Sequence, residues 1–88
     1  MNTAFAPLNK NITVDSFYFT HNLKSFPRRI DLGGGEQVTF AESGLRLLLR
    51  HGQRLAQLFD MNSLDGTMYR LRLENDQWTL VGVKGGQR

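Results

Sequence analysis

The stretch TFAESGLRLLLRHGQRLAQLFDM, residues 39–61, holds the densest pattern of leucine and arginine in this chain. At about 100° per residue, its main apolar side chains fall within an arc of roughly 120°, as on an amphipathic helix. Thr39 and Glu42 have the spacing of a capping box, with Ser43 as an alternative N-terminal cap. Gly52 falls on the apolar arc, where we expect it to permit close packing rather than to break the helix. The pattern therefore predicts a single helix whose core side consists of Leu45, Leu48, Leu49, Leu55, Ala56 and Phe59.

Three arginines occupy the opposite side of this predicted helix, at positions i, i+4 and i+8: Arg46, Arg50 and Arg54. Like charges four residues apart destabilise a helix by roughly 0.2–0.5 kcal/mol per pair, so such a row is unfavourable unless an anion compensates it. Glu42 can pair with Arg46, whereas the other two arginines have no local acidic partner. The alternative is a solvated face whose arginine stems cover apolar surface.

Residues on both sides of the predicted helix alternate as β-strands do. Before it, we expect a strand over 12–20, a second strand over about 26–32, a turn at the glycines 33–35 and a short returning strand over 36–39. The glycines lack the following Gly-Lys-Ser/Thr of a phosphate-binding loop, so we interpret them as a hairpin turn.

After the predicted helix, residues 68–73 and 78–83 predict a hairpin that turns at Asn75 and Asp76. A two-residue turn sets the register of such a hairpin. The expected cross-strand pairs are Leu73 with Trp78, Leu71 with Leu80, and Tyr69 with Gly82.

The expected fold class is therefore α+β, with the single amphipathic helix packed on one face of an antiparallel sheet in the order β-β-β-α-β-β. Eighty-eight residues fit one small domain, 1–88, in which we expect residues 1–10 to be a flexible arm and 85–88 a frayed tail.

Composition narrows the function classes. The chain has no cysteine, which excludes disulfides and thiolate metal sites. It shows neither a signal peptide nor an apolar run of about 18 residues, so we expect a cytoplasmic protein without a membrane partner. The net charge of +3 and a pI near 9.8 rest on eight arginines and three lysines, a balance that suits anionic partners without requiring them.

No pattern typical of catalysis is present. The two histidines, His21 and His51, have no carboxylate or imidazole at a spacing that would form a catalytic pair or a metal site. We therefore expect a non-catalytic protein without a metal or other cofactor.

The window 21–29 contains basic residues and no acid, and the aromatic residues Phe17, Tyr18, Phe19 and Phe26 lie within it or beside it. Single-stranded nucleic acids bind to such combinations of cations and exposed rings. Our leading hypothesis is a small binding module whose cationic surface meets an acidic partner, either nucleic acid or an acidic protein face. Acids at 31, 36 and 42 could neutralise this surface. The candidate residues are Lys24, Arg28, Arg29, Arg46, Arg50 and Arg54.

The alternative hypothesis is a protein-interaction module or a homodimer. On the predicted helix, Phe40, Leu47 and Leu58 form a second, weaker apolar stripe that a single sheet would leave exposed. Either this stripe or an open sheet edge could bind a second copy.

Overall fold

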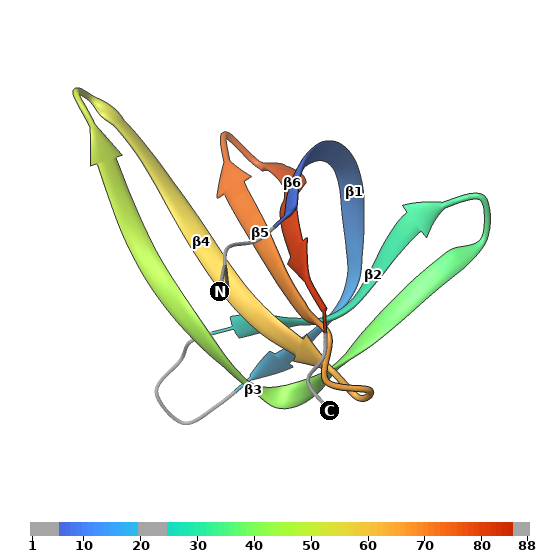
Figure 1. Cartoon of the computed structure of the whole chain (residues 1–88). Helices are drawn as coiled ribbons and strands as arrows, with labels where there is room; N and C mark the ends of the chain where they lie inside the picture. Colours follow the sequence, from blue (N-terminus) through green and yellow to red (C-terminus); the bar gives the residue numbers. More distant parts are fainter. Residues whose placement is uncertain (1–5, 20–24, 86–88) are drawn as a thin grey trace.

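The computed structural model describes residues 6–19 and 25–85, and these form a closed antiparallel β-barrel (Figure 1). Each strand pairs with the next along the chain, and the last pairs with the first, so the sheet closes. The strands are β1 (Ala6–Phe19), β2 (Ser25–Gly33), β3 (Glu36–His51), β4 (Arg54–Ser63), β5 (Met68–Glu74) and β6 (Gln77–Lys84).

The predicted α+β fold is wrong, because the described residues contain no helix and the segment 39–61 is extended. Leucines recur there at the helical spacing, but those at 45, 47 and 49 also recur at the two-residue spacing of a strand. Gly52 fits a turn better than a helix: it lies in the left-handed region, with a φ of +65°, as the first central residue of the turn between His51 and Arg54. Glycine would cost a helix interior about 1 kcal/mol, whereas it favours this turn.

Both predicted hairpins are confirmed. The glycines 33–35 connect β2 to β3, and all three have positive φ. At the other hairpin, Asn75 and Asp76 have φ values of 54° and 61°, the geometry of a type I′ turn. In this second hairpin, Leu73 lies opposite Trp78 and Leu71 opposite Leu80, as predicted. The third predicted pair is wrong, because a bulge between Arg70 and Leu71 places Tyr69 opposite Val83 rather than Gly82.

The N-terminal strand β1 begins earlier than the strand predicted over residues 12–20. It begins at Ala6, so residues 6–10, expected to belong to a flexible arm, pair with β6 instead. The rest of that arm, and residues 86–88 of the expected tail, lie outside the described residues.

The core lies inside the barrel and draws on every strand. Its buried side chains are Ile12, Ile30, Phe40, Phe59, Met61, Leu71 and Leu80. Two aromatic contacts cross this core: the ring centres of Phe26 and Phe59 lie 5.8 Å apart, edge to face, and those of Phe40 and Tyr69 lie 5.5 Å apart. Burial of this apolar surface is the main favourable term for a chain without disulfides.

Strand β3 bends where it leaves the barrel wall. Its register with β2 extends only to Thr39, and a bulge separates Phe40 from Gly44, where steady pairing with β4 begins. A Cβ at position 44 would contact the end of the Met61 side chain and come within 3.2 Å of the carbonyl oxygen of Asp60, so glycine lets the two strands approach closely at this bend. Beyond the bend, β3 and β4 continue as a long hairpin that projects from the barrel (Figure 1).

We call residues 45–56 of this hairpin the β3–β4 arm. Residues directly opposite each other on antiparallel strands point to the same side. The side chains in phase with the core residue Phe59 define its inner face, which carries Arg46, Leu48, Arg50 and Leu55. The outer face carries Leu45, Leu47, Leu49, His51 and Arg54.

Candidate binding site

The arginine row expected on a helix does not form, because its members lie on two strands and on opposite faces of the hairpin. Arg46 and Arg50 share the inner face of the β3–β4 arm, about 13 Å apart along the strand. Arg54 lies on the outer face, where its Nη2 contacts Oε2 of Glu74 at 2.7 Å. Arg54 is therefore paired with one of this molecule's own carboxylates, which Arg72 Nε also approaches at 3.8 Å. The three arginines do not form one continuous cationic surface.

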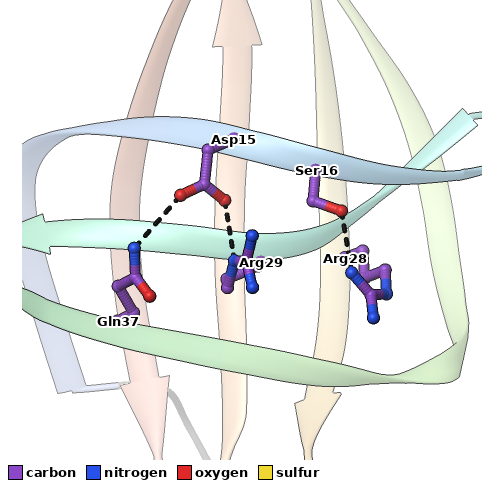
Figure 2. A network of polar contacts seen from close by, with 5 residues as sticks. All are labelled: Asp15, Ser16, Arg28, Arg29 and Gln37. Carbon is purple, nitrogen blue, oxygen red and sulfur yellow. Dashed lines mark hydrogen bonds and ion pairs between the residues drawn. The ribbon is translucent and has the colours of Figure 1, made fainter.

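The other predicted cationic residues are Lys24, Arg28 and Arg29, and of these Arg29 has an acidic partner (Figure 2). Asp15 on β1 accepts from Arg29 Nε at 3.1 Å and from Gln37 Nε2 at 3.2 Å, thereby linking three neighbouring strands. Arg28 has no acidic partner among the described residues. Lys24, the remaining member, lies outside the described residues.

Arg28 is instead held by neutral groups. Its Nη1 donates to Ser16 Oγ at 3.0 Å, and its guanidinium carbon lies 5.9 Å from the centre of the Tyr18 ring. A cation over an aromatic face is attracted by the ring quadrupole. Its charge therefore remains exposed and uncompensated.

Arg46 has a different environment, because it contributes to a cavity of about 350 Å³ at the base of the β3–β4 arm. We call this cavity the Arg46 pocket. Its walls come from all six strands and the β5–β6 turn. The lining residues are Phe17, Ser25, Arg46, Gln57, Phe59, Leu73, Asp76 and Trp78.

Arg46 is half-buried and makes neither an ion pair nor a hydrogen bond within the part of the chain that the structure describes. A charge removed from water without a partner is unfavourable, so this guanidinium is available to a ligand anion. Asp76 is the acidic member of the lining and is exposed at its turn.

Aromatic rings lead from the surface into the Arg46 pocket. Phe19 is 78% exposed, and its ring centre lies 6.4 Å from that of Phe17. Phe17 lies 6.2 Å from Trp78, which in turn lies 5.2 Å from the buried Phe59. The successive tilted rings offer a ligand several apolar surfaces beside one cation.

The alternation of residues 12–20 identified Phe17 and Phe19 as aromatic neighbours of the basic window, but sequence reasoning missed Gln57 and treated Trp78 only as core. No sequence signal joins these residues to Arg46, because the barrel brings together strands from both ends of the chain.

The apolar stripe expected from Phe40, Leu47 and Leu58 does not form. Phe40 is fully buried in the core, whereas Leu47 and Leu58 face each other on the outer side of the hairpin. The exposed leucines of the β3–β4 arm are a different set, with fractional exposures of 41–60%: Leu45, Leu47, Leu48, Leu49 and Leu55.

Among residues 6–19 and 25–85, no three His, Asp or Glu side chains converge on a point where a metal ion could be held. The same residues include no helix long and apolar enough to cross a membrane. Comparisons of the chain with protein-family models, with curated proteins and with solved structures found no match.

Proposed function

We propose that this protein is a binding module for single-stranded nucleic acid, with the Arg46 pocket as its central site. The observation that carries the proposal is the half-buried guanidinium of Arg46, which has no acidic partner among the described residues and lies in a cavity lined by Phe17 and Trp78. Single strands bind to surfaces that combine cations for the phosphates with rings on which bases stack.

The size of the pocket supports an unpaired base rather than a duplex. A volume of about 350 Å³ lies near the lower end of the range for small-ligand sites, which is about 300–1,000 Å³. A base can enter such a concave site only when it is unstacked and unpaired, as in a single strand. The amide of Gln57 can then hydrogen-bond to the edge of the base.

The remainder of the strand would lie outside the pocket. Arg50 continues the inner face of the β3–β4 arm beyond Arg46, and Phe19 offers an exposed ring at the entrance. These two residues supply a second phosphate contact and a second stacking surface. Asp76 opposes the binding of an anion, so we expect a moderate affinity. The phosphate contacts of Arg46 and Arg50 should make this affinity fall as the salt concentration rises.

The test is fluorescence anisotropy with a labelled single-stranded oligonucleotide at two salt concentrations, with the matching duplex as a competitor. We expect Arg46→Gln to weaken binding and to reduce the slope of log affinity against log salt by about 1. Phe19→Ala removes an exposed ring without disturbing the core and is expected to cost about 1–3 kcal/mol of binding free energy.

Arg54→Gln is the matched control, because it removes the same charge from the same hairpin but on the outer face, away from the Arg46 pocket, where Arg54 is already paired with Glu74. It should leave the affinity unchanged. Absence of binding at low salt contradicts the proposal, and so does an equal loss in Arg46→Gln and Arg54→Gln, which would indicate attraction by net charge alone.

A further inference from the structure

Among residues 6–19 and 25–85, one edge of the sheet is open although the barrel closes. From Gly44 to His51, β3 pairs with β4 on one side and with no described strand on the other, because its register with β2 ends at Thr39. This leaves a row of backbone N–H and C=O groups free to pair with another strand.

The side chains along this edge favour its burial. The outer face carries Leu45 at 55%, Leu47 at 41% and Leu49 at 48% exposure, and the inner face carries Leu48 at 60%. The three outer-face leucines alternate along one side of the strand, and an exposed apolar row of this kind favours an interaction site. Proline, charged side chains or a bulge protect such edges. Residues 44–51 contain no proline, and the bulge of β3 lies before them; their charged side chains are Arg46 and Arg50, both on the inner face, so the outer face of residues 45–49 has no charge.

We propose that two copies of this chain associate by antiparallel pairing of their β3 edges, centred on Leu47. In such a dimer a two-fold axis runs perpendicular to the sheet, and the numbers of any two opposed residues add to the same value. This sum must be even, because opposed residues point to the same side of the sheet. Only a few registers therefore need to be compared.

The register centred on Leu47 places Leu47 opposite itself and Leu45 opposite Leu49 of the second copy. All three outer-face leucines then meet leucines. On the inner face, Arg46 lies opposite Leu48 of the second copy, and Arg50 lies opposite Gly44. Aliphatic pairs stabilise a sheet, and no two arginines face each other.

The neighbouring registers are less favourable. Centring on Leu48 brings Arg46 opposite Arg50 of the second copy, and centring on Arg46 brings Arg46 opposite itself; directly opposed like charges are destabilising. Centring on Leu49 places Leu47 opposite His51, which loses two of the leucine pairs. The chain's own pattern thus selects one register.

The inference rests on the β3 edge and the leucines, so it is independent of the proposed binding of nucleic acid. It does affect the geometry of that site, because Leu48 of the second copy would lie against the aliphatic stem of Arg46 at the base of the arm.

Cysteine cross-linking tests the register, since the natural chain has no cysteine. In Leu47→Cys the two new thiols face each other, at a separation that a disulfide can bridge. We expect this variant to form a covalent dimer under mild oxidation, whereas Leu45→Cys and Leu49→Cys should cross-link only when the two variants are mixed.

Leu64→Cys is the matched control, because Leu64 is 77% exposed in the β4–β5 turn, away from the β3 edge. It should not cross-link. Equal cross-linking of Leu64→Cys and Leu47→Cys would overturn the inference as random collision, and efficient self-cross-linking of Leu48→Cys would overturn the register.

Sedimentation equilibrium of the unmodified chain tests the association itself. We expect a concentration-dependent dimer, which Leu47→Arg abolishes by opposing two arginines and which Leu48→Glu retains by placing a carboxylate opposite Arg46. A monomer at every concentration overturns the inference. Oligonucleotide binding by the monomeric variant Leu47→Arg distinguishes a failure of this inference from a failure of the proposed function. If the monomer still binds the oligonucleotide, the proposed function holds without the dimer.

Discussion

Arg70 binds both carboxylate oxygens of Asp60, with Nε 2.7 Å from Oδ1 and Nη2 2.8 Å from Oδ2. The two residues lie opposite each other on β5 and β4, at the outer face of the sheet next to Leu45. Only 12% of the Asp60 side chain is exposed. The hydrogen bond to Asp60 raises the pKa of Arg70, and its effect outweighs the opposing effect of burial.

We expect Asp60→Ala to lower the free energy of unfolding by about 1–3 kcal/mol, because it leaves a partly buried guanidinium without its charged acceptor. Urea denaturation measures this loss. Arg54→Gln breaks an ion pair whose arginine is 73% exposed, and it should cost less than about 1 kcal/mol. Equal losses for the two substitutions would contradict the distinction between them.

Gly44→Ala should destabilise the barrel, because the added Cβ collides with Met61 and also comes within 3.2 Å of the carbonyl oxygen of Asp60. Overpacking of this kind costs about 1–3 kcal/mol. Shortening the neighbour in Met61→Val should reduce the penalty, so the double variant is expected to lose less stability than the sum of the single losses. Strict additivity in thermal denaturation would refute this cause.

Asp76→Gly should stabilise the protein by a few tenths of a kcal/mol to about 1 kcal/mol. Asp76 has a φ of 61°, which strains any residue with a Cβ, and Asn-Gly is the preferred sequence of a type I′ turn. The same substitution removes a carboxylate from the Arg46 pocket and should strengthen oligonucleotide binding. A rise in melting temperature with an unchanged affinity for the oligonucleotide would support the relief of strain in the turn and contradict the role of Asp76 in the Arg46 pocket.

Asp65 makes stability depend on pH in the acid range. The hydroxyl of Ser63 and the amide of Thr67 donate to its carboxylate, and these bonds lower the pKa of Asp65 below its ordinary value of 3.8. The pKa of Asp65 is thus lower in the folded state than in the unfolded state. Its contribution to the free energy of unfolding is therefore fully present above the ordinary pKa of 3.8 and is lost as the pH falls through the folded-state pKa.

Asp65→Asn should therefore flatten the dependence of the melting temperature on pH below about pH 4. Melting curves recorded across the acid range for both proteins test this expectation. An unchanged slope would show that other carboxylates dominate acid unfolding.

Two hairpins could be predicted because short-range chemistry specifies them. The glycines 33–35 and the pair Asn75–Asp76 favour positive φ, and alternation on either side of each turn indicates the buried face. The bulge after Arg70 could not be foreseen, since it depends on how β6 must also pair with β1.

The helix prediction failed because residues 39–61 satisfy two periods at once. Their leucines fit both a helical arc and a strand, and local propensity does not choose between them. Pairing of Gln57 with Leu73 and of Phe59 with Leu71 attaches β4 to β5, and these long-range contacts favour the extended chain.

For the candidate site, sequence identified the basic residues but not their partners. Arg54 and Glu74 lie twenty residues apart in sequence and meet only across the sheet. The sequence therefore could not show that Arg54 has an acidic partner whereas Arg46 has none among the described residues. Arg46 acquires its significance in the same way, from Phe17 and Trp78 at opposite ends of the chain.

By itself, the sequence determined the local turns, the absence of disulfides, the excess of arginine and the alternation of the C-terminal hairpin, because each depends on residues close together in the chain. Only the tertiary structure decided that residues 39–61 are two strands, which arginines are neutralised and which leucines are exposed. Those outcomes depend on barrel closure, which brings distant residues into contact and assigns each side chain to the core, a pocket or an open edge.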